Sequence, residues 1–373
     1  MQNRRLVVVG ASFAGLACAR AAAARGVPTT VLETRSEPGL GIRTTGILVK
    51  EAADLLDVPP RLIRKLAKVR LYSPSLKSID LERPGYTFLA TDTPELMRWW
   101  ARETERYGVE IRWGSRFRGG TRASDTLIEL DDTDLDCGFL VGADGPRSQV
   151  AREFGLGVNT RLLSGIEAEC RGFGEIADDR LHVFLDSEMA RGYIGWIVPG
   201  VGITQVGLAC RHPARPDLDR FIARLTTVFD TGRLIITGYR AGLIPVGGPI
   251  ARSTDRNVML IGDAAGWVSP LTAGGIHCAL QWGRSAGIAI ADHLIDGAPH
   301  PARVLGRQVP SFSCKRFLRR IYDMGPPNRL YDALIGRPAL GKLAQLVFFH
   351  HRGLLSREAW AEWLDFCRNP AGG

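Results

Sequence analysis

The chain has 373 residues, of which 45% are hydrophobic and 23% are charged, a composition typical of a globular protein longer than one ordinary small domain. Its net charge of +9 suits anionic partners such as phosphates, diphosphates, anionic lipid or nucleic acid, and scattered surface arginines would produce the same surplus. The sequence contains no run of about 18 consecutive apolar residues, so no transmembrane helix is predicted. The irregularly spaced cysteines form no Cys-x-x-Cys pair, which favours free thiols in the cytoplasm and no metal site.

The N-terminal region has the strand, turn, helix, strand and acid order of a dinucleotide-binding fold. Residues 5–10 predict a buried parallel strand, and residues 10–15 (GASFAG) predict a glycine turn. An alanine-rich helix follows to about residue 25, and a second apolar strand, 29–32, ends on Glu33. This order predicts a nucleotide at the start of the first helix, where unpaired N–H groups favour a pyrophosphate.

Single residues of this region have distinct expected roles. Gly10 permits the tight turn, Gly15 permits close packing of helix on sheet, and Ser12 replaces the usual middle glycine with another small residue. Glu33 can accept hydrogen bonds from a ribose 2′-OH. Both NAD and the adenosine half of FAD meet that condition.

The region that follows predicts a loop over the cofactor and a helix. Residues 36–50 form a glycine-rich stretch with Arg43, which we expect to lie over the nucleotide or the flavin edge. Thr93 as N-cap and Pro94 at the first helical position predict a helix that extends to Tyr107.

Two later stretches each lead from an apolar strand to an aspartate. In residues 139–148 the strand ends at Asp144 and Gly145, and a helix begins at Ser148. In residues 258–280 the strand ends at Asp263, and a helix begins at two glycines after a proline corner. Two such turns and the N-terminal turn indicate one extended cofactor held between them.

We therefore predict an α/β (α+β) fold: a dinucleotide-binding βαβ FAD domain with an inserted antiparallel β-sheet substrate domain and a C-terminal helical region. The expected ranges are 1–154 and 252–298 for the FAD-binding domain, 155–251 for the substrate domain and 299–373 for the helical region. The C-terminal region carries a basic cluster at Lys315, Arg316, Arg319 and Arg320 and aromatic residues at Trp360 and Trp363. It predicts a helical cap on the β domain or, alternatively, a peripheral membrane contact.

The three turns, GASFAG at 10–15, GADGPRS at 142–148 and GDAAG at 262–266, resemble those of FAD-dependent oxidoreductases of the p-hydroxybenzoate hydroxylase superfamily. Three further stretches are similar to the geranylgeranyl reductase family: GYIGWIVP at 192–199, GLIPVGGP at 242–249, and 262–276 with its PLTAGGI core. The resemblance covers roughly residues 4–295.

The resemblance implies non-covalent FAD and the reduction of isolated prenyl double bonds in an isoprenoid or prenylated substrate. NADPH or ferredoxin would donate the electrons. The residues it places at the cofactor are Gly10, Ser12, Phe13, Ala14, Gly15, Glu33, Thr34, Arg35, Arg43, Thr44, Asp144, Gly145, Asp263, Gly266, Pro270, Gly274, Gly275 and Ile276. It implies that the protein binds no nucleic acid and lies in the cytoplasm, either free or associated with a membrane. It leaves the oligomeric state open.

Two positions depart from the family pattern. The reductases often carry a cysteine where Thr44 stands, and an Asp-Arg pair where this chain has Asp92 and Thr93. The first departure leaves the exact substrate and any role of a thiol open, and the second weakens one expected cofactor contact without changing the expected fold.

The expected chemistry is hydride transfer from reduced flavin to an alkene that is protonated at the same time. The N–H groups at Gly274 and Gly275 would stabilise negative charge on the reduced flavin. Tyr193 or His277 would supply the proton, and Tyr193 and Trp196 would line the substrate cavity; Tyr193 as a plain cavity wall and His277 as a structural histidine are the alternatives.

Other functions fit the same fold, because fold alone does not select a reaction. The main rival is an FAD-dependent aromatic monooxygenase. A flavin halogenase, a flavoprotein that passes electrons to a membrane quinone, and a non-redox cyclase that uses reduced flavin are further alternatives.

Overall fold

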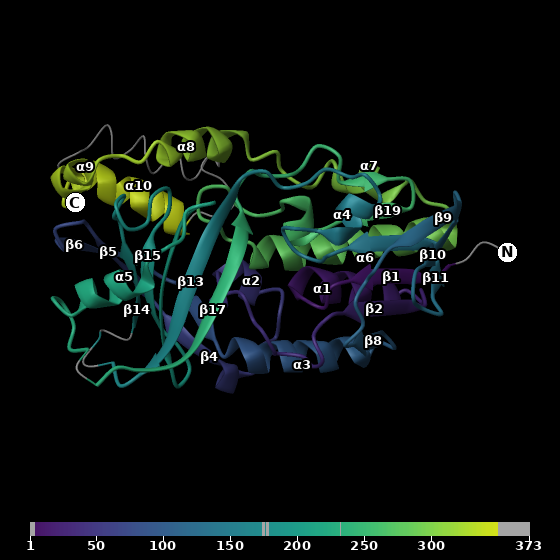
Figure 1. The fold of residues 1–373 in the computed structure, drawn as a ribbon, viewed down its shortest axis with the longest axis horizontal. Helices are drawn as coiled ribbons and strands as arrows, with labels where there is room; N and C mark the ends of the chain where they lie inside the picture. Colours follow the sequence, from purple (N-terminus) through teal and green to yellow (C-terminus); the bar gives the residue numbers. More distant parts are fainter. Residues whose placement is uncertain (1–3, 174–175, 177–178, 232, 350–373) are drawn as a thin grey trace. The chain divides into compact units, whose positions relative to one another are not determined.

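The computed structural model describes residues 4–173, 176, 179–231 and 233–349, and the chain divides into two compact units (Figure 1). Unit 1 consists of Met1–Ile63, Thr91–Leu162 and Gly242–Phe312. Unit 2 consists of Arg64–Ala90, Leu163–Ala241 and Ser313–Gly373.

Unit 1 is built on a sheet with the strand order β18-β19-β12-β1-β2-β8. These strands are β1 (Leu6–Val9), β2 (Thr29–Glu33), β8 (Glu110–Trp113), β12 (Phe139–Gly142), β18 (Thr254–Asp255) and β19 (Val258–Leu260). Neighbours pair in parallel, except that β18 is antiparallel to β19. Every residue of β1, β2 and β12 is buried, as expected for parallel strands covered on both faces. The sheet confirms the predicted dinucleotide-binding fold.

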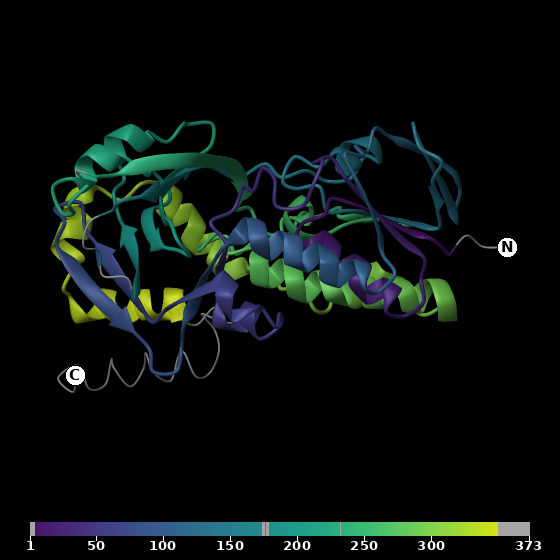
Figure 2. The same ribbon diagram turned by 90° about the horizontal axis from the view of Figure 1, so that it is seen from below.

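Two helices of unit 1, α1 (Phe13–Ala23) and α6 (Ile276–Asp296), lie side by side (Figures 1 and 2). A Cβ on Gly283 would lie 2.6 Å from the carbonyl oxygen of Ala14, and a Cβ on Gly287 would overlap the carbonyl oxygen of Cys18. Because residues 14 and 18 meet 283 and 287 in the same order, the two helices run in the same direction. Glycine on α6 therefore allows the helix to touch the backbone of α1.

Shorter elements complete unit 1. The helical ones are α2 (Lys50–Ala53), η1 (Pro60–Leu62), α3 (Thr93–Glu105), α4 (Gln149–Glu153), η2 (Gly262–Ala265) and α7 (Pro301–Leu305). The strands are β3 (Ile47–Leu48) and an antiparallel set of β9 (Gly120–Ser124), β10 (Leu127–Leu130) and β11 (Asp136–Cys137).

The N-cap of α3 is Asp92, and the prediction of Thr93 was wrong by one residue. The Asp92 carboxylate accepts a hydrogen bond from the backbone N–H of Glu95 at 3.2 Å, which is the usual geometry of an N-cap side chain. The side chain of Thr93 is buried instead, and Pro94 falls in the first turn as expected.

Unit 2 contains a sheet with the order β17-β13-β16-β15-β14-β5-β6. Its strands are β5 (Lys68–Tyr72), β6 (Ser78–Glu82), β13 (Leu162–Arg171), β14 (Arg180–Phe184), β15 (Gly195–Pro199), β16 (Thr204–Arg211) and β17 (Ile235–Pro245), and β4 (Ile63–Leu66) and β7 (Phe88–Thr91) flank the 64–90 segment. The sequence placed residues 64–90 in the cofactor-binding range. In the structure this segment belongs to unit 2, because β5 pairs in parallel with β14 and antiparallel with β6.

The core of unit 2 lies between this sheet and α5 (Leu218–Leu225). The rings of Tyr72 and Phe184 stack at 4.4 Å, and Phe221 of α5 meets Phe184 edge to face at 5.3 Å. The C-terminal helices of this unit are α8 (Ser313–Asp323), α9 (Asn328–Leu334) and α10 (Pro338–Phe349). Trp360 and Trp363 lie outside the described residues.

Candidate functional site

The predicted turns converge at one edge of the unit 1 sheet. Val9 is the register partner of both Leu32 and Gly142, and Gly142 is in turn the partner of Leu260. The carboxyl ends of β2, β1, β12 and β19 are therefore level, and each leads directly into a predicted site residue. In open sheets of this kind, ligands bind outside the carboxyl ends of the strands.

Glycines let the first two turns touch. Gly10 has φ +107°, and a Cβ there would lie 2.5 Å from the carbonyl oxygen of Ala143. A Cβ on Gly15 would overlap the carbonyl oxygen of Gly10, so α1 can approach the turn only with glycine at this position. Close packing thus explains the spacing of Gly10 and Gly15, as the sequence predicted.

The helices that begin at this edge, α1 and α6, have no capping side chain. Their N-caps are Ser12 and Gly275, and neither accepts a side-chain hydrogen bond from its first turn. In contrast, Asp92, Ser148 and Asp217 cap α3, α4 and α5. The N-cap side chains therefore do not neutralise the positive ends of these two helix dipoles, which favour a ligand with negative charge at this edge.

Glu33 lies at the end of β2, where the backbone fixes both of its carboxylate oxygens. Oε2 accepts a hydrogen bond from the N–H of Ala11 at 2.8 Å, and Oε1 accepts one from the N–H of Arg35 at 2.9 Å. The guanidinium of Arg35 lies 3.3 Å from Oε1. The acid is thus held beside the glycine turn, and the predicted ribose contact would use its remaining lone pairs.

Asp144 has a structural contact that the sequence did not reveal. Its Oδ2 accepts hydrogen bonds from the N–H groups of Gln149 at 2.6 Å and Val150 at 3.1 Å, so it caps α4 together with Ser148. Its Oδ1 is buried without a hydrogen-bond partner among the described residues. A buried carboxylate oxygen without a partner is costly, which fits an oxygen whose donor comes from a ligand.

Asp263 lies beside the start of α6. A Cβ on Gly275 would lie 3.3 Å from its Oδ1, so the carboxylate sits at the helix N-terminus. Burial raises the pKa of the Asp263 carboxyl from 3.8 to about 6. Within the described residues this carboxylate accepts no hydrogen bond, so its ionised form destabilises the native state, and a hydrogen-bond donor on a ligand would offset that cost.

Asn159 is a site residue that the sequence reasoning missed. Its Nδ2 donates hydrogen bonds to the carbonyl oxygens of Asp263 at 2.9 Å and Pro146 at 3.2 Å, and thereby joins the second turn to the third. Gly266, with φ +69°, packs on the carbonyl oxygen of Gly248, so the 242–249 stretch supports the same turn. An isolated asparagine carries no pattern from which this role could be read.

The loop with Arg43 and Thr44 is tied to the start of α3. Thr91 Oγ1 donates a hydrogen bond to the carbonyl oxygen of Gly46 at 2.8 Å, and Thr93 Oγ1 lies 3.4 Å from the carbonyl oxygen of Thr45. Thr93, which stands where the family often has arginine, therefore positions the loop that also contains the Thr44 departure.

The three predicted catalytic residues fall in different units. His277 is the second residue of α6 in unit 1, whereas Tyr193 and Trp196 belong to unit 2, with their rings edge to face at 6.5 Å. Trp196 Nε1 donates to Glu167 Oε2 at 2.8 Å, which fixes the indole. Burial raises the pKa of Tyr193 to about 12, so its phenol is protonated throughout the neutral pH range.

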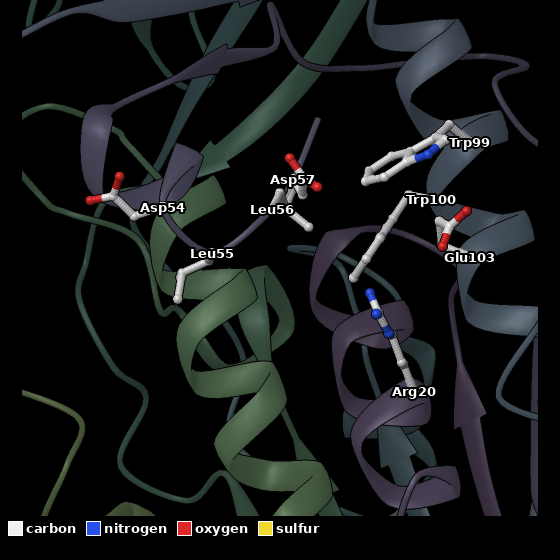
Figure 3. A pocket seen from close by; sticks show the side chains of 8 residues that line it. All are labelled: Arg20, Asp54, Leu55, Leu56, Asp57, Trp99, Trp100 and Glu103. Carbon is white, nitrogen blue, oxygen red and sulfur yellow. The ribbon is translucent and has the colours of Figure 1, made fainter. Parts of the chain in front are cut away.

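A separate cavity of about 540 Å³ in unit 1 lies between α1, α3 and residues 54–57 (Figure 3). Arg20 projects from α1 toward Trp100, its guanidinium carbon 5.0 Å from the centre of that ring. None of the predicted site residues lines this cavity. The cofactor prediction and this cavity therefore concern different parts of unit 1.

The comparisons with known proteins agree with this geometry. Residues 5–145 match the FAD-dependent oxidoreductase family DAO. The chain is 30% identical over 316 residues to digeranylgeranylglycerophospholipid reductase 2 of Methanosphaera stadtmanae, across 78% of this chain and 79% of the relative. This chain belongs to the geranylgeranyl reductase family of FAD-dependent oxidoreductases. The resemblance read from the sequence is thereby confirmed.

One further relative agrees with this family, and two solved structures share the fold. The digeranylgeranylglycerophospholipid reductase of Methanothrix thermoacetophila is 29% identical over 317 residues, which cover 78% of each chain. A geranylgeranyl bacteriochlorophyll reductase-like protein from Thermoplasma acidophilum has the same fold, with a TM-score of 0.81, 19% identity and coverage of 97% of this chain and 98% of that chain. Flavin-dependent brominase Bmp2, a triple mutant, shares the fold at a TM-score of 0.68 and 16% identity over 97% of this chain and 99% of that chain.

Proposed function

We propose that this FAD-dependent oxidoreductase saturates carbon–carbon double bonds of a prenyl chain. The observation that carries the proposal is the pair of uncapped helix starts, α1 and α6, beside Asp263 at the carboxyl edge of the parallel sheet. FAD would supply the hydride, and NADPH or ferredoxin would reduce it. The substrate is an isoprenoid or prenylated molecule, as the names of the relatives indicate for those proteins.

Each part of the site has a defined task in this proposal. The N–H groups at the start of α1, with Glu33, would hold the ADP half of FAD, and Arg43 and Thr44 would contact the cofactor. The Asp263 carboxylate would accept hydrogen bonds from hydroxyl groups of the cofactor. The positive end of the α6 dipole, at Gly275, would favour negative charge on the reduced flavin.

The two aromatic residues assigned to the substrate belong to unit 2. Trp196, fixed by Glu167, and Tyr193 form an aromatic wall that suits an apolar chain. The phenol of Tyr193 keeps its proton at neutral pH and can donate it to the alkene carbon opposite the one that receives hydride. His277 on α6 is the alternative proton donor.

The cofactor assignment is tested with Asp263→Ala. We expect this variant to purify without flavin absorbance, because it removes the acceptor at the centre of the site. Asp292→Ala is the matched control, since this acid lies near the C-terminal end of α6 and forms an exposed ion pair with Arg25 at 3.0 Å. A fully yellow Asp263→Ala protein would contradict the assignment.

The reaction is tested by the mass of the product. Purified protein with a chemical reductant and a panel of prenyl lipids should yield products heavier by two hydrogens per double bond. A second experiment distinguishes the reductase from the aromatic monooxygenase: the flavin is reduced without oxygen, and oxygen is then admitted. A transient hydroperoxide absorbance, or hydroxylation of an aromatic compound, would identify a monooxygenase and refute the reductase.

A further inference from the structure

Helix α8 in unit 2 presents its apolar side chains to solvent and buries a charge. Phe317 is 60% exposed and Ile321 is 43% exposed, and Met324, directly after the helix, is 69% exposed. Arg319 on the opposite side is only 1% exposed. A surface helix of a globular protein ordinarily has the reverse arrangement.

Polar contacts fix this orientation of α8. Arg319 Nε donates to Asp323 Oδ1 at 2.9 Å, and Arg319 also donates through NH2 to the carbonyl oxygen of Gly192. The Tyr322 hydroxyl donates to the carbonyl oxygen of Tyr193 at 2.8 Å. The bonds to Gly192 and Tyr193 thus hold the polar side of the helix to the rest of unit 2, and rotation to hide the apolar side would break both of them. Arg319 is therefore the buried member of the basic cluster that the sequence contains at residues 315–320.

The outward side of α8 is half apolar and half basic. At about 100° per residue, Phe317, Ile321 and residue 324 share one side of the helix, and Arg316 and Arg320 lie next to them. Both arginines are exposed, and neither has an ion-pair partner within the described ranges. We call these five residues, Arg316, Phe317, Arg320, Ile321 and Met324, the α8 face.

The surrounding chain has the same character. Residues 313–349 contain only two acids, and both are engaged: Asp323 pairs with Arg319, and Asp332 accepts from the N–H of Ser75 at 2.8 Å. Further exposed leucines follow in α9, at Leu330 and Leu334. The unneutralised charge on this part of the surface is therefore positive.

We propose that the α8 face docks the protein on the surface of an anionic lipid bilayer. The apolar side chains would enter the boundary between headgroups and acyl chains, and the arginines would pair with lipid phosphates. Contact with a second copy is disfavoured, because a symmetric pairing would bring the same two arginines of each copy together. This proposal goes beyond the reductase reaction and does not depend on it.

The test is sedimentation of the full-length, flavin-loaded protein with vesicles of pure phosphatidylcholine or of phosphatidylcholine and phosphatidylglycerol in equal parts. Binding to the anionic vesicles is expected, and it should weaken as salt is raised. Arg316→Gln/Arg320→Gln should lower the affinity by roughly twentyfold, since each arginine near an anionic surface contributes about fivefold. Phe317→Ser/Ile321→Ser should lower it by at least about tenfold.

Matched controls come from exposed residues elsewhere. Ile235→Ser, which changes a side chain that is 63% exposed, and Arg303→Gln/Arg307→Gln, an exposed arginine pair four residues apart, should bind like the wild type. Equal binding to both kinds of vesicle, binding that survives both α8 variants, or no binding at all would overturn the proposal. A dimer that dissociates in Phe317→Ser/Ile321→Ser would assign the face to a second copy instead. Flavin content, which needs no membrane, reports whether each variant is folded.

Discussion

At the scale of single residues, the site is marked by carboxylates that the protein does not fully satisfy. Asp144 has a buried oxygen without a partner, and burial raises the pKa of Asp263 to about 6. A structural acid would ordinarily have acquired a donor, since a buried group without one destabilises the fold. The destabilisation by these carboxylates is tolerated where a bound ligand provides the missing donor. It should therefore be measurable as a lower free energy of unfolding in ligand-free protein.

The first prediction concerns the pH dependence of flavin-free protein. The unfolded chain releases the Asp263 proton near pH 3.8, whereas the native state keeps it to about pH 6. The native state therefore binds more protons, and the wild type loses stability as the pH rises between these values. Asp263→Asn should be more stable than the wild type by up to about 3 kcal/mol above pH 6 and equally stable below pH 4.

Urea unfolding of both proteins over a pH series measures this difference. Asp292→Asn, at an exposed ion pair near the C-terminal end of α6, should change stability by less than about 1 kcal/mol and without that pH profile. An advantage of Asp263→Asn that stays constant between pH 4 and 6 would show that the carboxylate is already satisfied within the protein.

A second prediction at this scale separates the two proton donors. If Tyr193 protonates the alkene, Tyr193→Phe should lower turnover by about 10²–10⁴-fold, with little change in flavin content. Burial raises the pKa of this phenol to about 12. Its ionisation should therefore cause no change of the wild-type rate with pH in the neutral range. A rate that falls through that range, together with normal turnover in Tyr193→Phe and loss in His277→Gln, would assign the proton to His277.

At the scale of elements, the position of α6 depends on glycines that face α1. Gly283 and Gly287 bring the helices into backbone contact. A Cβ added to Gly262 would lie 2.7 Å from the Cβ of Ala14, so glycine also lets the third turn approach α1. The cofactor turns are thus aligned by packing as well as by the strand register.

We expect Gly287→Ala to destabilise the protein by about 1–3 kcal/mol, even though alanine favours helix, because its Cβ would overlap the carbonyl oxygen of Cys18. Gly341→Ala is the matched control: it lies in α10 and its Cβ would meet nothing within 4 Å. That substitution should stabilise by about 0.5–1 kcal/mol. Chemical denaturation compares the two, and equal effects would mean that α6 can move away from α1 without cost.

At the scale of the whole molecule, the sequence was informative where the structure is local. Gly10, Asp144 and Asp263 each follow an apolar strand directly, so the turn is encoded within a few residues, and the family resemblance supplied the way in which the strands associate. The N-cap of α3 was displaced by one residue because Asp92 and Thr93 are both good capping residues and only the hydrogen bond to Glu95 distinguishes them.

The remaining features depend on residues far apart in the chain. Arg319 reads as a surface charge in any sequence pattern, and its burial follows from Gly192, which lies more than a hundred residues earlier. Asn159 becomes important only because two turns meet beside it, and residues 64–90 join unit 2 only through the pairing of β5 with β14. Periodicity and motif spacing contain no information on such contacts.

The last prediction follows from the division into units. The predicted cofactor residues all belong to unit 1, so binding of FAD should stabilise that unit by linkage, by about 4 kcal/mol when free FAD is a thousandfold above its dissociation constant. In amide hydrogen exchange, FAD added to flavin-free protein should protect residues 10–15 and 262–276 and the strands that lead to them, while β14, β15 and β16 exchange as before. Asp263→Ala with the same FAD supplies the control, since it should show no protection. If β14–β16 became protected to the same extent as β1 and β12, the two units would unfold as one cooperative body, and the cofactor would stabilise the whole protein rather than its own unit.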